Sequence, residues 1–402
     1  MFDQPSTSSS PSAPAGGAIV SSISLLREFS IPLIAGIIIA LLWANLSPGS
    51  YHNFIHTGVG ELHLEFAVNE LFMAIFFGIA AVEITDSLLP GGSMSSLKRA
   101  VTPLFATLGG VVGPIAIFFA LNALVGNSEL SRGWGITTAT DIAIAWLVAR
   151  LIFPKNHPAI SFLLLLAIAD DAIGLAIIAV FYPDPNHPLS PLALLLVALA
   201  VIICAALRWM KVRNYWPYLL LGGAFSWLGL FWAHLHPALA LVFVVPFMPH
   251  TRSPAQHTTF DLVEGEKSTL IAFEHEWKVI VDFGLLFFGL VNAGVQFSAV
   301  GTITWLILAA LLFGKTVGIY GFGLLASLFG FQLTGGMTRR DLFLVSMIAG
   351  IGLTVALFVA SAAFSDPLLE GAAKMGALGS ILIAPLAFLA NRLLKPNPAP
   401  PQ

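Results

Sequence analysis

Three aspartates lie inside apolar stretches of this sequence, and their carboxylates are the groups best suited to chemistry there. Asp141 is part of TTATDIAIA, and the adjacent Asp170 and Asp171 interrupt LLLLAIADDAIGLAIIAV. A carboxylate at the bilayer centre costs about 2.5–3.5 kcal/mol on insertion scales, so an acid in a membrane span is by default a candidate for function. These three acids are therefore the first residues to explain.

The adjacent pair favours a chemistry in which protons and a cation compete. Neighbours on a helix point about 100° apart, so one carboxylate can face a cavity as a cation ligand while the other meets a buried partner. Like charges repel each other, and burial disfavours ionisation. Asp170 and Asp171 can thus exchange protons for a transiently bound metal cation near physiological pH.

Lys315 is the matching positive charge, in the apolar segment WLILAALLFGKTVGIYGFG. A lone buried lysine must pair with an acid or lose its proton. About ten residues continue the segment on either side, which argues against snorkelling to an interface. Asp141 and Lys315 could also compensate the half-charges of helix ends that meet inside the membrane. For Asp141, both the ligand role and the compensating role stay open.

The composition predicts that these residues belong to a helical membrane protein. Of 402 residues, 57% are hydrophobic and 10% are charged, with a mean hydropathy of +0.89, whereas soluble domains carry about 25% charged residues. The net charge of −3 gives no reason to expect a nucleic-acid partner. A single cysteine, Cys204, excludes a disulfide framework. Because Walker A, GxGxxG and HExxH motifs are missing, we expect no cofactor.

Apolar runs long enough to cross a hydrocarbon core about 30 Å thick recur along the chain. They predict one all-α, polytopic membrane domain over residues 29–394. The lead, 1–28, is rich in Ser, Pro, Gly and Ala and is predicted to be disordered, and 395–402 is predicted to be a tail. The twelve predicted spans are approximately 30–47, 69–88, 101–125, 134–150, 159–182, 191–207, 216–233, 237–249, 279–297, 303–328, 341–364 and 375–394.

The basic residues predict the orientation of these spans. With a cytoplasmic N-terminus, fifteen of the 18 lysines and arginines lie inside, and only Arg132 and Lys374 lie outside. This asymmetry is a strong positive-inside signal. One missed helix would move every later loop to the opposite side of the membrane, so the asymmetry also supports the number of predicted spans. Both termini are therefore predicted to be cytoplasmic.

Two predicted spans are interrupted by glycine and threonine. The eleventh contains Gly350, Gly352 and Thr354, and in the fourth two glycines and three threonines, among them Thr140, precede Asp141. Broken segments in corresponding halves of a chain point to a transporter's binding site at the membrane midplane. We therefore predict that the fourth and eleventh helices are discontinuous and cross.

Four further titratable residues lie near the ends of predicted spans, and two of them, Glu274 and His275, could sense pH. Glu83 follows AIFFGIAAV at the predicted cytoplasmic end of the second span, where it is either a gate or an ordinary helix-end acid. Glu274 and His275 precede the ninth predicted span, and His236 lies in HLHPAL before the eighth. Histidine titrates near neutrality, but each of these residues could also be an ordinary loop or interface group.

Nine motifs resemble, in order and spacing, the NhaA-type sodium/proton antiporters, and they cover nearly the whole chain from about residue 28. The motifs are WAN (43–45), YHNF (51–54), MAIFFGIAAVE (73–83), ATLGGVVGP (106–114), TATDIAIA (138–145), AIADDAIG (167–174), NAGV (292–295), GKTVGI (314–319) and GIGLTVALFVASAAF (350–364).

The resemblance implies a fold and a site. The fold would be twelve helices with inverted repeats, the fourth and eleventh being the crossed, broken pair. Asp171 would be the principal cation ligand and proton carrier, and Asp170 would alternate between Lys315 and the ion. Thr140 and Asp141 would shape the site.

The resemblance also implies electrogenic exchange of two protons for one sodium or lithium ion across a bacterial inner membrane. Glu83, His236, Glu274 and His275 match family positions implicated in pH response. The sequence departs from the family after Glu83, where ITDSL replaces a basic pair and an acid, and after His275, where a second histidine and Pro-Trp are missing. These departures fall in the cytoplasmic funnel and concern regulation more than exchange.

Two alternatives and one question of assembly stay open. On the same scaffold, the chain could be a cation-coupled symporter of an organic solute, or an intramembrane aspartyl enzyme using Asp141 and Asp171. The unmatched buried Lys315 argues against the enzyme. In family members a periplasmic hairpin joins two protomers, but the loop 55–69 is shorter here, so a homodimer is neither required nor excluded.

Overall fold

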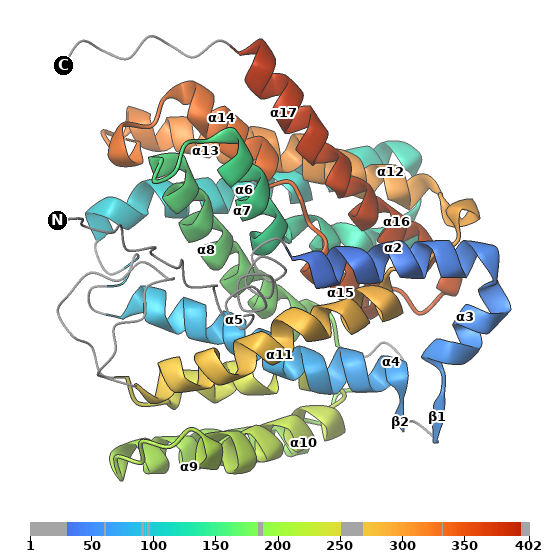
Figure 1. The fold of residues 1–402 in the computed structure, drawn as a ribbon, viewed down its shortest axis with the longest axis vertical. Helices are drawn as coiled ribbons and strands as arrows, with labels where there is room; N and C mark the ends of the chain where they lie inside the picture. The colour runs from blue at the N-terminus through green and yellow to red at the C-terminus, as the bar shows by residue number, and fades with distance from the viewer. Residues whose placement is uncertain are drawn as a thin grey trace, which may run out of the picture.

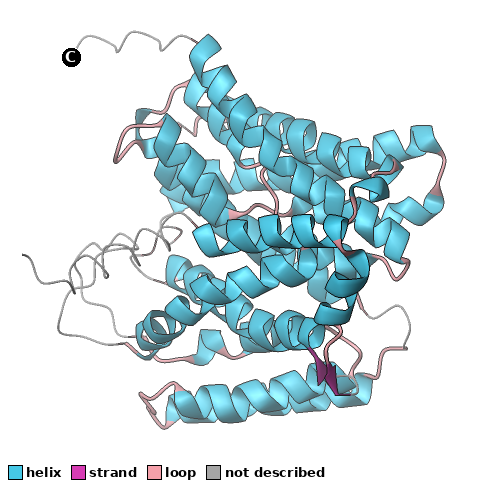
Figure 2. Cartoon of the chain, turned by 45° about the vertical axis from the view of Figure 1, so that its right-hand side comes forward, coloured by secondary structure: helices cyan, strands magenta, loops and turns pink. Residues whose placement is uncertain are grey.

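The computed structural model describes residues 30–394 except 60–61, 90–91, 93, 95–96, 184–187, 251–267 and 332. The predicted lead and tail, 1–28 and 395–402, lie outside the described residues. The described chain is helical apart from loops and one antiparallel hairpin of two-residue strands, which pairs Gly58 with His63. Figure 2 shows this hairpin beside the helices. The predicted all-helical class is thus confirmed, with the hairpin as a small exception.

The first third of the fold leads into a long helix that contains two prolines. Its elements are α2 (Ile31–Leu46), α3 (Pro48–Ile55), β1 (Gly58–Val59), β2 (Leu62–His63), α4 (Leu64–Phe66), the π-helical η1 (Ala67–Phe72), α5 (Met73–Leu88) and α6 (Leu97–Val125).

The middle third alternates α-helices with short 3-10 or π-helical segments, labelled η. Its elements are η2 (Ser128–Thr138), α7 (Ile142–Ile152), α8 (Pro158–Phe181), η3 (Pro191–Ala193), α9 (Leu194–Trp209), η4 (Tyr218–Gly223), α10 (Ala224–Trp232), η5 (Pro237–Phe243), η6 (Val245–Phe247) and α11 (Thr269–Asn292). In Figure 1, α9 and α10 lie together at the lower edge of the molecule.

The last third completes the helical body around the centre. Its elements are η7 (Phe297–Ala299), α12 (Thr302–Ala309), η8 (Ala310–Lys315), α13 (Thr316–Leu328), η9 (Thr334–Gly336), α14 (Arg339–Ile348), α15 (Thr354–Ala363), α16 (Pro367–Gly379), η10 (Ser380–Leu382) and α17 (Ile383–Leu393).

Six helical stretches of the described chain are long and apolar enough to cross a membrane, or seven if one bent pair counts as a single span. The bent pair is η2 with α7. The six stretches are Leu64–Leu88, Ala100–Val125, Pro158–Phe181, Pro191–Trp209, Thr302–Leu328 and Pro367–Leu393. The remaining predicted spans correspond to shorter or more polar helices, so the structure supports a polytopic membrane protein without fixing twelve spans.

The ninth predicted span, 279–297, was wrong at both ends, since α11 runs from Thr269 to Asn292. Hydropathy missed its polar first turns, which begin where the Ser268 hydroxyl accepts a hydrogen bond from the Ile271 N–H at 3.2 Å. Consequently Glu274 and His275 lie within this helix and not before it. The eighth predicted helix, 237–249, was wrong in type, because η5 and η6 are 3-10 segments that begin and break at prolines.

Close glycine contacts place the helix that carries Lys315 against α6. A Cβ added at Gly109 would lie 2.1 Å from the carbonyl oxygen of Gly318, and one added at Gly113 would lie 2.3 Å from that of Gly314. Small residues allow helix backbones to approach closely in membranes. Lys315, next to Gly314, is thereby held deep in the helical body with no exposed surface.

Candidate functional site

Two interrupted helices meet at the centre of the fold. The chain leaves helical geometry over 139–141, between η2 and α7, which are inclined by 55°, and again over 349–353, between α14 and α15. The Asp141 N–H donates to the Ile351 carbonyl at 2.7 Å, and the Thr140 hydroxyl donates to the Ala349 carbonyl at 2.9 Å. Each break therefore satisfies backbone groups of the other, as buried non-helical backbone in a membrane protein must.

The carboxylate of Asp141 lies at two helix N-termini at once. One oxygen accepts a hydrogen bond from the Ile144 N–H at 3.1 Å, in the first turn of α7. The other accepts from the Thr354 N–H at 3.2 Å and from the Thr354 hydroxyl at 2.5 Å, at the start of α15. Because helix N-termini carry about half a positive charge each, this geometry suits the compensating role that the sequence left open for Asp141.

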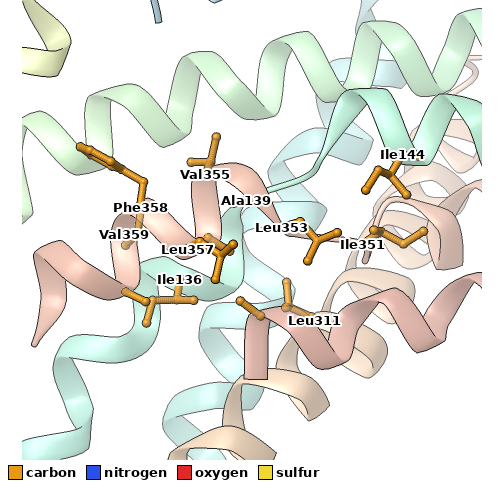
Figure 3. Close-up of a cluster of buried hydrophobic side chains, with 14 of the residues drawn as sticks. Ile136, Ala139, Ile144, Leu311, Ile351, Leu353, Val355, Leu357, Phe358 and Val359 are labelled. Carbon is orange, nitrogen blue, oxygen red and sulfur yellow. The ribbon is translucent and has the colours of Figure 1, made fainter. Parts of the chain in front are cut away.

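Apolar side chains surround the two breaks and exclude water from them. Figure 3 shows residues of both interrupted segments packed together, with Leu311 of η8 among them. Ile136, Leu311 and Ile351 have no exposed surface. Polar support comes from Ser380, whose hydroxyl accepts from the Gly352 N–H at 3.1 Å. Hydrogen bonds are electrostatically stronger in such an apolar setting than in water.

Lys315 reaches the breaks from η8 and forms the central ion pair. Its Nζ lies 2.5 Å from Oδ2 of Asp170 and 2.5 Å from the Thr140 hydroxyl oxygen, and both charged side chains are essentially unexposed. Through Thr140 the ammonium is linked to the Ala349 carbonyl, which follows the C-terminus of α14. The ion pair therefore joins α8 and η8 to both interrupted segments.

Asp170 and Asp171 differ in their partners. Among the described residues, Oδ1 of Asp170 has no hydrogen-bond partner although it is buried. Asp171, on the next position of α8, is half-buried, and no ion pair or hydrogen bond to it is found in the described part of the chain. The charges that act on Asp171 are those of Asp170, Glu83 and Asp141, all negative, and that of Lys315. The sum of these charges is negative, which favours the binding of a cation or a proton by an ionised Asp171.

Glu83 and Glu274 share a cation that the sequence analysis did not single out. Lys278 Nζ lies 3.5 Å from Oε1 of Glu83 on α5 and 3.3 Å from Oε1 of Glu274, one turn earlier on α11. The three side chains are each between one fifth and three tenths exposed. His275 lies on the same helix and is exposed. The structure thus brings Glu83 and Glu274 together and leaves His275 outside the cluster.

His236 lies apart from these residues, beside Glu70. Its Nδ1 is 3.7 Å from Oε1 of Glu70, and its ring packs against Phe358 of α15 with centroids 5.4 Å apart. The other carboxylate oxygen of Glu70 accepts from the Ala238 N–H at 3.1 Å. Within the described residues, Nε2 of His236 is buried without a hydrogen-bond partner. His236 therefore contacts one of the interrupted helices through its ring.

The partners missed by sequence reasoning are Lys278, Glu70 and Ser380. Lys278 and Glu274 are spaced i, i+4, which is the spacing of a helical ion pair. That signal was available, but it was hidden by the assignment of Glu274 to a loop. No pattern in the sequence links Glu70 to His236 or Ser380 to Gly352, because these pairs lie far apart in the chain.

The fold is similar to that of a solved structure, the sodium proton antiporter MjNhaP1 from Methanocaldococcus jannaschii. The TM-score is 0.53, at 15% sequence identity, over 94% of this chain and 96% of that one. At this identity the likeness concerns the fold alone. Together with the six helical stretches that are apolar enough to cross a membrane, it defines this protein as a polytopic helical membrane protein with a buried charged centre.

Sequence comparison defines the family. A family model described as Na+/H+ antiporter 1 matches residues 25–390. The chain is 59% identical over 374 residues to the Na(+)/H(+) antiporter NhaA 2 of Pelobacter propionicus, covering 93% of this chain and 98% of that protein. It is 61% identical over 373 residues to the Na(+)/H(+) antiporter NhaA of Geotalea uraniireducens, covering 92% and 96%. The chain therefore belongs to the NhaA-type Na+/H+ antiporter family.

Family membership confirms the resemblance stated from the nine motifs and the assignment to membrane-embedded antiporters. The relatives are named as transporters and not as enzymes, which agrees with the expectation that this chain is not an enzyme.

Proposed function

We propose that this protein is an electrogenic antiporter that expels sodium or lithium ions in exchange for external protons across a bacterial inner membrane. The observation that carries the proposal is the unequal pair on α8: Asp170 is held by Lys315 at 2.5 Å, whereas Asp171 has no ion pair or hydrogen bond to any described residue. The family supports the ions, since its named members are Na+/H+ antiporters.

Coupling follows from competition for the same oxygens. A sodium ion is bound by several oxygen atoms, and Asp171 offers a carboxylate that is not already engaged. If Lys315 leaves Asp170, the second carboxylate becomes available to the ion, and Thr140, which also accepts from Lys315, is released with it. Protonation of the two acids removes the negative charge that holds the cation. Each ligand can therefore load only after the other has left.

The exchange is electrogenic when two protons enter for each ion that leaves. One net positive charge then moves inward per cycle, and an inside-negative potential favours the cycle by about 2.3 kcal/mol per charge per 100 mV. The two acids of α8 supply two proton sites for one cation, which is the stoichiometry that the family resemblance implies.

The proposed architecture is a single domain over residues 29–394 with twelve spans, inverted repeats and both termini in the cytoplasm. Its crossed, discontinuous helices would be η2 with α7 and α14 with α15. The hydrogen bonds between their breaks and the position of Asp141 at two N-termini support this arrangement. It places Lys315, Asp170 and Asp171 at the midplane, where transporter sites built from broken helices lie.

Purified protein in liposomes tests the function directly. We expect sodium efflux to acidify the liposome interior, and an inside-negative potential set by potassium and valinomycin to accelerate both fluxes. Sodium flux that requires an added organic solute would favour the symporter. An exchange rate that does not change with the membrane potential would reject the electrogenic stoichiometry.

Lys278→Met is expected to shift the pH at which transport begins toward the alkaline side while leaving the maximal rate intact. Lys278 lies 3.5 Å and 3.3 Å from Glu83 and Glu274, and without its charge the two acids can stay close only if one of them is protonated. The pH profile of sodium-driven proton flux in everted vesicles measures the shift. Lys278→Arg, which keeps the charge, serves as the matched control, and an unchanged profile in the methionine variant would remove this cluster from pH control.

A further inference from the structure

Two imidazoles and a carboxylate gather at the hairpin, away from the central acids. His56 follows the end of α3, His63 is in β2, and Glu65 is in α4. Nδ1 of His56 lies 3.6 Å from Oε2 of Glu65, and Nε2 of His63 lies 3.9 Å from the same oxygen. One ligand atom from each residue lies within 4.8 Å of the other two. Figure 1 shows β1 and β2 next to α3 and α4.

The backbone holds all three residues in place before any ligand arrives. His56 caps α3, with its N–H donating to the His52 carbonyl at 3.2 Å. His63 pairs with Gly58 across the hairpin. Leu64, next to Glu65, donates its N–H to the Thr57 carbonyl at 3.1 Å. The three side chains thus project from a scaffold whose backbone is already hydrogen-bonded, so little ordering is needed to bring them onto one ion.

The scaffold itself is anchored to the helical body. The Tyr51 hydroxyl lies 2.8 Å from the Leu290 carbonyl and 2.9 Å from the Val291 carbonyl, at the end of α11. Tyr51 is buried, and burial raises the pKa of its hydroxyl, so it stays a hydrogen-bond donor at neutral pH. At the other end, α4 continues through η1 into α5. The hairpin is therefore held on one side by the contact of α3 with α11 and on the other by its continuation into α5.

We propose that His56, His63 and Glu65 form a binding site for a divalent transition-metal ion of the zinc class. Zinc takes imidazole nitrogen at about 2.0–2.1 Å and carboxylate oxygen at about 2.0–2.2 Å in tetrahedral geometry, which sets ligand atoms roughly 3.4 Å apart. The two nitrogen–oxygen separations of 3.6 and 3.9 Å need only a small contraction around an ion, and the two imidazole nitrogens, which lie within 4.8 Å of each other, move together in the same contraction. Two nitrogen ligands select zinc, copper or nickel over calcium or magnesium, which take oxygen.

The site is open to solution and incomplete in protein ligands. The side chain of His56 is 41% exposed and those of His63 and Glu65 are each 29% exposed, so an ion can enter and water can fill the fourth position. The ring of His52 lies 4.3 Å from that of His56, but its nitrogens are not among the three grouped ligand atoms. Bound metal would tie the end of α3 to the start of α4, on the external side in the proposed orientation.

Calorimetric titration of the full-length, EDTA-treated protein in detergent with Zn²⁺ alone tests the site. We expect one saturable equivalent per chain, with the affinity lowered at least about tenfold in Glu65→Gln and further in the double variant His56→Ala/His63→Ala. His52→Ala is the matched control and should bind as tightly as the native protein. Cobalt in place of zinc should give the intense visible absorption of a four-coordinate ion.

Three results would overturn the proposal: no saturable equivalent in the native protein, equal affinity in the double variant, or the same loss in His52→Ala as in Glu65→Gln. Melting curves in the absence of metal should be the same for all variants, because these side chains are partly exposed, and this comparison separates lost binding from lost folding. The titration measures binding only, so its outcome does not depend on the transport function.

Discussion

Asp171→Asn is expected to reduce sodium-driven proton exchange to background while leaving the folded protein intact. Asparagine has nearly the same shape but carries no negative charge and takes up no proton, so the cation loses its proposed principal ligand and one of the two proton sites is removed. The fold should tolerate the change because Asp171 makes no ion pair or hydrogen bond to any described residue. Asp170, Glu83 and Asp141 repel the Asp171 carboxylate and Lys315 attracts it, so a neutral side chain at this position removes three repulsions and one attraction.

Two measurements separate chemistry from folding in this variant. Sodium added to the purified protein in weakly buffered detergent should release protons from the native chain and none from Asp171→Asn, across the pH range. The melting temperature of the variant should equal or exceed that of the native protein. Asp366→Asn is the matched control, since Asp366 is exposed and caps α16 through the Leu368 N–H at 3.0 Å, a role that asparagine also fills. Full exchange by Asp171→Asn would reject the proposed ion site.

How much of this site the sequence could predict depends on the kind of signal each residue gives. Acids and a lysine inside apolar runs stand out because the bilayer makes them costly, so Asp141, Asp170, Asp171 and Lys315 were found without any structure. Which acid Lys315 meets is a different matter. From the residues alone all three acids were candidates, and only the family resemblance pointed to Asp170.

The fold was predictable to a similar depth. Hydropathy located the helical segments because apolar residues face lipid. It cannot locate the ends of helices whose first or last turns are polar and capped by hydrogen bonds. It therefore began the ninth span near Lys278 and missed the polar turns that start at Ser268. It also treated the stretch between Pro237 and Pro249 as one span, where the structure has two 3-10 segments, the second of which contains Pro246. Hydropathy gave no signal for the hairpin that contains His63.

Contacts between distant polar residues lie beyond single-sequence reasoning. Glu70 meets His236, Glu83 meets Lys278 and Ser380 meets Gly352, and nothing in the sequence near either partner specifies the other. The hydrogen bonds between the two helix breaks are of the same kind. Glycine and threonine predicted that the fourth and eleventh spans are interrupted, but only the packed structure shows that Asp141 accepts from Thr354.

Lys315→Ala is expected to destabilise the protein by about 3–5 kcal/mol, because removal of one partner leaves a buried charge uncompensated. Asp170 would lose the ammonium at 2.5 Å in a place where its other oxygen has no partner among the described residues. Thr140 would lose its donor as well. Thermal unfolding in detergent, followed by tryptophan fluorescence, should show a clear fall in the melting temperature. Transport should survive with a displaced pH profile, since Asp171 remains.

A double-mutant cycle with Asp170→Asn isolates the pair from other effects of each substitution. If Lys315 and Asp170 act as a buried pair, the double variant should recover much of the stability lost in Lys315→Ala, because no isolated charge is left. Additive losses would mean that the two side chains contribute independently, and an unchanged melting temperature in Lys315→Ala would count against the pairing altogether. Because Asp171 stays in every variant of the cycle, sodium-induced proton release measured in the same preparations shows whether the ion pair shapes stability or exchange.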